Sequence, residues 1–255
     1  MEKILKIAKV SVLESFRRKD PYVVLLLAAL VVFGAGLFSR FGTEGVGKFV
    51  KDIGFTVTGV LSVLVCVVAA ARQLPTEIQN RTLYPLLAKP VSRVQVFLGK
   101  FIGVGVMASA VVVLFFAELY VLFKLLGVPV SIVFFHALYL RVVAMWIIAG
   151  LTLTLSLFTT QGANVTISML LAVAMQTFAN AIVTVRTELE GWGLRFIETV
   201  YWLLPHLELF DLTKREVHGW PAPPLWVLAA LTAYGALYSL LFMSVGMRRF
   251  QVRNL

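Results

Sequence analysis

The sequence predicts an all-α, polytopic membrane protein with six transmembrane helices, organised as a single transmembrane domain over residues 1–255. Three observations carry this prediction. The 255 residues are 60% hydrophobic and 14% charged, whereas about a quarter of the residues in a soluble domain are charged. The apolar residues gather into six long runs, and the net charge of +10 is confined to the segments on one side of those runs.

Each apolar run has at least about the 17 residues that a helix needs to cross the hydrocarbon core. Backbone N–H and C=O groups in lipid must be paired within their own segment, so we expect every run to form an α-helix. The predicted spans are residues 22–38, 53–71, 96–123, 132–158, 165–185 and 225–247. The third and fourth runs are the longest, and we expect them to tilt, kink or project beyond the bilayer.

Residues 1–20 precede the first span and carry six basic side chains. On a helical wheel, one face is apolar and the opposite face is charged. The apolar face holds Ile4, Leu5, Ala8, Val12 and Phe16. This pattern favours an N-terminal interfacial elbow helix that lies on the cytoplasmic leaflet and contacts membrane lipid. The alternative is a basic tail that only sets the topology.

The distribution of charge predicts that both termini lie in the cytoplasm. With this orientation, 14 of the 23 Lys and Arg residues and 4 of the 13 Asp and Glu residues are cytoplasmic. The cytoplasmic side then carries the whole net charge of +10 and the other side carries none, as the positive-inside rule requires. The basic composition therefore needs no nucleic-acid partner.

The polar segment 72–95, between the second and third spans, is predicted to be a compact helical loop. Its prolines interrupt the chain, because proline lacks an N–H and restricts the residue before it. Thr76-x-x-Gln79 fits a capping box, which predicts a short helix that begins at Thr76. Ser92-x-x-Gln95 fits a second capping box, which would begin the third span.

The stretch LPTEIQNRTLYPLLAKPVSRVQVFLGKFIG, residues 74–103, resembles the cytoplasmic loop after the second span of type-2 ATP-binding-cassette (ABC) exporter permeases. Within that family it is most similar to the permeases of nitrous-oxide-reductase maturation and gliding-motility exporters. The hydropathy layout agrees with the family over the whole chain. The matching positions are Glu77, Arg81, Thr82, Lys89, Pro90, Ser92, Arg93, Gly99 and Lys100.

The resemblance implies a permease subunit without catalytic residues, in the inner membrane of a bacterium. In the family this loop carries a coupling helix that docks on a separate cytoplasmic ATPase, which binds the ATP and Mg²⁺. It also implies a second permease copy, most simply a homodimer, and leaves a periplasmic accessory protein open. The coupling residues would be Thr76, Glu77, Ile78, Arg81, Thr82, Leu83, Leu86, Leu87 and Lys89. The alternative is a basic loop that only sets the topology.

The longest external segment is residues 186–224. Its stretch 192–205 is amphipathic and rich in aromatic residues, which suits a membrane interface. Similar permeases carry re-entrant or surface helices here that form an external gate. A plain loop with an aromatic anchor is an equally good interpretation.

Two charged residues fall within predicted spans, where an ionisable group needs a partner or water. Glu118 and Arg141 lie at similar depths from the turn that joins their spans, so we expect them to be level. A structural ion pair is favoured over a pair at the translocation path or gate. In the fifth span, Thr177, Asn180 and Thr184 share one face, which would line a path or make interhelical hydrogen bonds.

The sequence lacks the GxxxxGK[ST] phosphate loop, so it predicts no ATP site of that type in this chain. His206, Glu208, Asp211 and His218 match no metal-ligand spacing, and a solvated acidic loop is favoured over a metal site. The alternative functions are a membrane-embedded lipid-modifying enzyme and an ion-coupled secondary carrier. The first would need clustered carboxylates or histidines, and the second would need more intramembrane carboxylates than Glu118. The substrate stays open.

Overall fold

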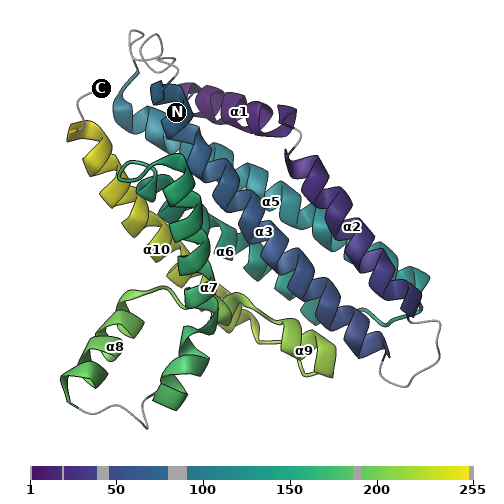
Figure 1. The fold of residues 1–255 in the computed structure, drawn as a ribbon. Coiled ribbons are helices and arrows are strands. Elements are labelled where there is room, and N and C mark those ends of the chain that lie inside the picture. The colour runs from purple at the N-terminus through teal and green to yellow at the C-terminus, as the bar shows by residue number, and fades with distance from the viewer. Residues whose placement is uncertain (1, 19, 39–45, 80–90, 186–190, 253–255) are drawn as a thin grey trace.

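The computed structural model describes residues 2–18, 20–38, 46–79, 91–185 and 191–252, and the elements within these ranges are helices (Figure 1). The six apolar runs are helical, with bounds α2 (Asp20–Phe38), α3 (Val46–Gln79), α5 (Arg93–Leu125), α6 (Ile132–Leu155), α7 (Gln161–Val185) and α10 (Leu225–Val252). The shorter elements are α1 (Glu2–Arg17), α8 (Trp192–Leu203), η2 (Leu207–Phe210) and α9 (Thr213–His218). The all-α class is confirmed.

Four helices in the described ranges are long and apolar enough to cross a membrane. They are Gly47–Gln79, Arg93–Leu125, Ile132–Leu155 and Leu225–Val252. A shorter apolar helix covers Tyr22–Gly34. The structure thus supports a multi-pass membrane protein, and the count of six spans stays a prediction.

The prediction of a short helix that begins at Thr76 is wrong. No short helix begins at Thr76, because α3 continues for 34 residues through Pro75 as far as Gln79. Pro75 removes one backbone hydrogen bond from the last turns. Neighbouring contacts compensate for this loss: Leu74 is fully buried, and the side chain of Glu77 pairs with Lys100 of α5.

The second capping box is confirmed at the start of α5. The Gln95 backbone N–H donates to Ser92 Oγ at 3.2 Å, and the Ser92 N–H donates to Gln95 Oε1 at 3.1 Å. Next to this cap, Arg93 Nη1 donates to the carbonyl oxygens of Phe250 at 3.2 Å and Gln251 at 3.1 Å. The beginning of α5 and the end of α10 therefore lie at the same end of the bundle.

The core forms where α3, α5 and α6 meet. Phe55, Phe116 and Phe134, one from each helix, pack edge to face, with ring centroids 5.2–5.8 Å apart. Such aromatic pairs add about 0.5–1.5 kcal/mol beyond the burial of their surface. Helix α5 lies at the centre of the fold and contacts α1, α2, α3, α6 and α10.

Helix α1 buries a face that only partly overlaps the predicted apolar face. Its buried residues are Ala8, Ser11 and Ser15, whereas Leu5 is 62% exposed. The buried face packs on Gly103 of α5. A Cβ added at Gly103 would lie 2.6 Å from Ser11 Cβ. Small residues on both helices allow this close approach, which the interfacial-helix prediction did not include.

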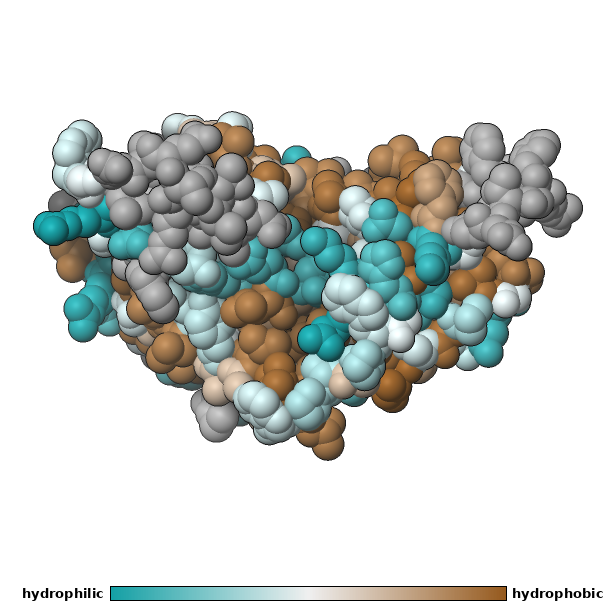
Figure 2. Space-filling view, turned by 90° about the horizontal axis from the view of Figure 1, so that it is seen from below, coloured by the Kyte–Doolittle hydropathy of each residue, from teal (hydrophilic) through white to brown (hydrophobic). Residues whose placement is uncertain are grey.

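The bundle has two distinct ends, which we name the α1 end and the α9 end (Figure 1). Helix α1, the last turns of α3, the beginning of α5 and the end of α10 meet at the α1 end. Helices α8 and α9 and the beginning of α3 lie toward the other end. Viewed from the α9 end, hydrophilic side chains gather across the molecule between hydrophobic flanks (Figure 2).

Candidate functional site

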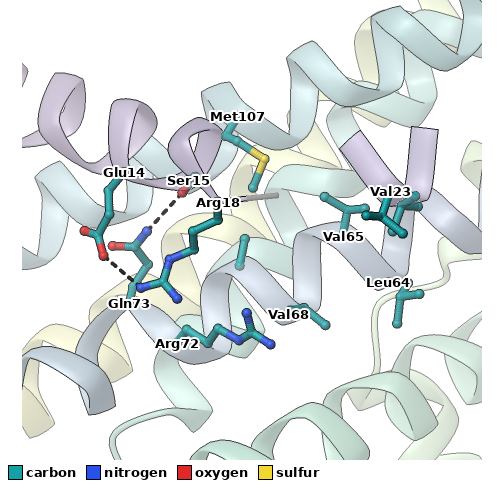
Figure 3. Close-up of a pocket in the computed structure, with 12 residues that line it drawn as sticks. Glu14, Ser15, Arg18, Val23, Leu64, Val65, Val68, Arg72, Gln73 and Met107 are labelled. Atoms are coloured by element: carbon teal, nitrogen blue, oxygen red, sulfur yellow. Dashed lines mark hydrogen bonds and ion pairs between the residues drawn. The ribbon is translucent and has the colours of Figure 1, made fainter. Parts of the chain in front are cut away.

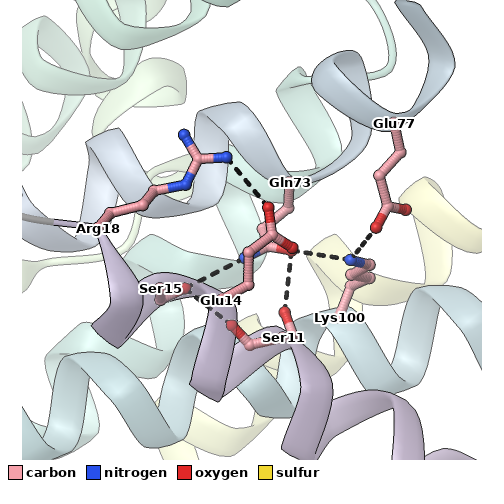
Figure 4. A network of polar contacts seen from close by, with 7 residues as sticks. All are labelled: Ser11, Glu14, Ser15, Arg18, Gln73, Glu77 and Lys100. Atoms are coloured by element: carbon pink, nitrogen blue, oxygen red, sulfur yellow. Dashed lines mark hydrogen bonds and ion pairs between the residues drawn. The ribbon is translucent and has the colours of Figure 1, made fainter. Parts of the chain in front are cut away.

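A buried lysine organises the α1 end. Lys100 lies in the second turn of α5 and is 2% exposed. Its ammonium donates to Gln73 Oε1 at 3.0 Å and forms a short ion pair with Glu77 Oε1 (Figure 4). An ammonium is buried at low cost only when charged and polar partners replace its water. Both partners belong to the last turns of α3, so Lys100 binds α5 to α3.

The same network reaches α1 through Gln73. Ser11 Oγ donates to Gln73 Oε1 at 2.9 Å, and Gln73 Nε2 donates to Ser15 Oγ at 3.3 Å (Figure 4). Both serines are buried on the face of α1 that packs on α5. Hydrogen bonds and close packing therefore join α1, α3 and α5 into one body at this end of the bundle.

The predicted coupling residues divide into two groups. Thr76, Glu77 and Ile78 are described, and they form the last turn of α3. Glu77 points toward Lys100, and its side chain is 22% exposed, so it is largely turned away from solvent (Figure 4). The remaining coupling residues, Arg81, Thr82, Leu83, Leu86, Leu87 and Lys89, lie outside the described residues. The coupling role of both groups stays a prediction.

The predicted Glu118–Arg141 ion pair is wrong. Arg141 Nη2 lies 3.7 Å from Asp211 Oδ1, and Arg141 is nearly buried. Glu118 makes no ion pair with it, although both side chains belong to described helices. The segment that contains η2 folds back onto α6 and α7 and supplies a carboxylate that is far away in the sequence.

Arg141 and Asp211 line a cavity of about 320 Å³ between α3, α6 and α7. Gln176 Nε2 donates to Asp211 Oδ2 at 2.9 Å, and Thr177 lines the same cavity. Apolar residues of α3 and α7 form the other walls. Thr177 of the fifth predicted span and Arg141 therefore line the same cavity, and a role of either residue in a translocation path stays a prediction. The side chains of Asn180 and Thr184 lie outside the described part of α7.

A second buried charge cluster lies at the α9 end, and the sequence did not predict it. Lys51 Nζ lies 2.7 Å from Glu216 Oε1, and the Glu216 side chain is fully buried. Ser131 Oγ donates to Glu216 Oε2 in a short hydrogen bond, and the Ser131 N–H donates to Glu216 Oε1 at 3.4 Å. This cluster binds α9 to the beginning of α3 and the cap of α6. Its only sequence signal is Ser131, a recognisable N-cap residue.

Asp211 and His206, from the cluster considered as a metal site, make structural contacts. Asp211 Oδ1 accepts from the Thr213 backbone N–H at 2.9 Å, which begins α9. The backbone N–H of His206 donates to the Tyr234 hydroxyl at 3.1 Å. Within the described ranges, no three His, Cys, Asp or Glu side chains are grouped as a metal ion requires.

Polar residues at the beginning of α7 make one interhelical hydrogen bond and one hydrogen bond within the helix. Asn164 Nδ2 donates to the Thr152 carbonyl oxygen of α6 at 3.1 Å, and Ser168 Oγ donates to Asn164 Oδ1 at 3.0 Å. Asn164 and Ser168 are fully buried. Asn164 therefore packs α7 on α6 at the beginning of the helix, and Gln176 and Thr177 line the cavity further along. The two interpretations of the face with Thr177, Asn180 and Thr184 both stay open.

The sequence matches a known family of membrane transporter proteins. A family model described as an ABC-2 family transporter protein matches residues 16–185, which is more than half of the chain. The match includes Gln73, Glu77 and Lys100 of the α1-end network. No curated protein matches the sequence.

Proposed function

The chain belongs to the ABC-2 family of transporter membrane proteins, and we propose that it is the permease subunit of an exporter driven by a separate cytoplasmic ATPase. Permeases of this family pair with an ABC ATPase, which binds the ATP. The observation that carries the proposal is the buried Lys100–Gln73–Glu77 network, because it fastens both helices that flank residues 80–92 to α1.

In this proposal the ATPase binds the segment between α3 and α5, with Arg81, Thr82, Leu83, Leu86, Leu87 and Lys89 as coupling residues. Apolar anchors give affinity for a partner groove, and charged residues fix orientation. A displacement of this segment acts on α3 and α5 together, because Lys100 pairs with Glu77 across them. The packing of Gly103 against Ser11 then carries α1 along with α5.

Helix α3 supports a route from the α1 end to the α9 end. It runs without a break from Lys51 to Gln73, a length of about 33 Å at 1.5 Å per residue. Lys51 is bound to Glu216 of α9, and the Gly59 backbone lies against the Arg141 guanidinium. We infer that movement of α3 reshapes the cavity beside Arg141 and Asp211, which lies on or near the translocation path.

The proposal includes six spans in a single domain, with both termini in the cytoplasm of a bacterium and the α9 end facing outward. Two copies would enclose the path, and α8, η2 and α9 would form the external gate. The exposed side chains Leu170 and Val173 of α7 suit contact with lipid or with the second copy. A periplasmic accessory protein and the substrate are left open.

A lipid-modifying enzyme and an ion-coupled carrier remain the alternatives. The same experiment separates them from the proposal, since only a coupled permease requires an ATPase at residues 80–90. A photo-cross-linking residue is introduced at Thr82, and a matched one at the exposed Lys214 of α9. In membranes of the native host, we expect position 82 to capture an ABC ATPase and position 214 to capture none. Failure of position 82 to capture an ATPase, at equal levels of inserted protein, would refute the proposal.

The orientation has its own test. Cys66 is fully buried and is first replaced with alanine. A single cysteine is then placed at Asn80 or Lys214, and intact cells are treated with a membrane-impermeant maleimide. We expect labelling at 214, and labelling at 80 only after permeabilisation. Labelling of position 80 from outside would overturn the cytoplasmic assignment.

A further inference from the structure

The structure contains an amphipathic pocket beside the α1-end network and separate from the cavity at Arg141 and Asp211. It has a volume of about 330 Å³ and lies between α1, α2 and α3, with Met107 of α5 at its base (Figure 3). The transport proposal assigns no role to this pocket. Its two ends differ in chemistry, which indicates the class of ligand.

One end of the pocket is polar and basic. Arg18 and Arg72 lie there beside Glu14 and Gln73, so the net charge of the lining residues is positive (Figure 3). Arg18 Nη2 contacts Glu14 Oε1 at 3.0 Å, and this pair is about 40% exposed. A guanidinium has five N–H donors, so this contact leaves Arg18 able to bind an anion as well. Arginine binds phosphate oxygens with paired N–H groups.

The other end is apolar and lies further along α3, away from Arg72. Val23 of α2 and Leu64, Val65 and Val68 of α3 form its walls (Figure 3). From Arg72 to Leu64 the pocket follows α3 for eight residues, about 12 Å along the helix axis. Arg72 adjoins the apolar run that crosses the membrane, so the basic end lies at the membrane surface and the apolar walls lie in the hydrocarbon.

We propose that this pocket is a binding site for an anionic phospholipid. The phosphate of the headgroup lies between Arg18 and Arg72, and the acyl chain lies along Leu64, Val65 and Val68. Charge complementarity selects an anionic headgroup over a zwitterionic one, because basic side chains at the surface attract anionic lipid. The apolar walls select a lipid over free phosphate, because burial of hydrocarbon supplies much of the binding energy.

A lipid in this pocket would stabilise the α1 end of the bundle. Gln73 and Ser15 line the pocket and also belong to the α1-end network. A lipid bound there contacts α1, α2 and α3 together, and it stabilises their packing at the point where the coupling segment begins. Binding of a ligand to the folded state alone raises stability by mass action.

The test uses native mass spectrometry of the purified full-length chain with phosphatidylglycerol, phosphatidylcholine or inorganic phosphate. Two variants alter the pocket: Arg72→Gln removes a charge, and Val68→Phe fills the apolar end. Lys9→Gln is the control for charge, because Lys9 is exposed on α1 and lies outside the pocket. Val121→Phe is the control for bulk, because Val121 is exposed on α5.

We expect the wild-type chain to retain one molecule of phosphatidylglycerol. The fraction of chains that retain phosphatidylglycerol should be at least fivefold higher than the fraction that retain phosphatidylcholine. Arg72→Gln should lower retention about fivefold, which corresponds to about 1 kcal/mol for one basic residue near anionic lipid. Val68→Phe should lower it further, and both controls should stay within twofold of wild type. Equal retention of the two lipids overturns the proposal, as does unchanged retention in both pocket variants. Retention of inorganic phosphate at the same level would show an anion site without a lipid.

Discussion

We predict that removal of Glu77 and removal of Lys100 lower the free energy of unfolding by unequal amounts. Glu77→Ala leaves the Lys100 ammonium, whose side chain is 3% exposed, with Gln73 Oε1 at 3.0 Å. Breaking a buried pair in this way costs about 3–5 kcal/mol. Lys100→Met removes the more buried charge and leaves Glu77, whose side chain is the more exposed of the two at 22%. We expect a cost of about 1.5–3 kcal/mol, the range for a hydrogen bond to a charged group.

The assay is reversible unfolding of the purified protein in mixed micelles, with the double variant Glu77→Ala/Lys100→Met completing a thermodynamic cycle. The double variant should be more stable than Glu77→Ala alone, because it contains no uncompensated buried charge. Glu14→Ala is the control, since the Glu14–Arg18 pair is 40–42% exposed and should contribute less than about 1 kcal/mol. A larger cost for Lys100→Met than for Glu77→Ala would refute the burial reasoning. Additive costs would show that the two residues do not interact.

Two further predictions follow from close contacts. Gly103→Leu should destabilise the protein by at least about 1–3 kcal/mol, because its Cβ would lie 2.6 Å from Ser11 Cβ. Gly162→Leu should be tolerated, because nothing lies within 4 Å of its added Cβ; equal costs in thermal unfolding would contradict the packing of α1 on α5. A double-mutant cycle of Arg141→Met with Asp211→Asn should give a coupling energy of about 0.5–3 kcal/mol. A cycle of Arg141→Met with Glu118→Gln should give a coupling energy below about 0.5 kcal/mol. A larger coupling energy with Glu118 than with Asp211 would show that Arg141 pairs with Glu118 instead.

Local patterns predicted the elements well. Hydropathy alone indicated the helices, because each apolar run must pair its backbone groups internally in lipid. The Ser92 cap was also predictable, since it involves residues three apart in sequence and both of its hydrogen bonds form. The boundary at Thr76 was wrong, because the same local signals cannot report that buried contacts at Leu74 and Glu77 carry the helix through Pro75.

The pairing of buried charged side chains could not be predicted from local patterns. Glu118 and Arg141 are neighbours in the linear order of spans, yet Arg141 pairs with Asp211, which is 70 positions further along the chain. The Lys51–Glu216 pair joins residues 165 positions apart. A charge in a low-dielectric interior binds the group that the folded chain places nearest to it.

The sequence by itself therefore determined the class of protein, its helices and the family resemblance, because composition and short-range pattern encode these properties. The tertiary structure decided that Lys100 joins three helices, that α9 is bound to α3, and that an amphipathic pocket lies beside the network. These features arise from the packing of α1, α3, α5 and α9 against one another. Distances between residues far apart in sequence depend on that packing and leave no local signature in the chain.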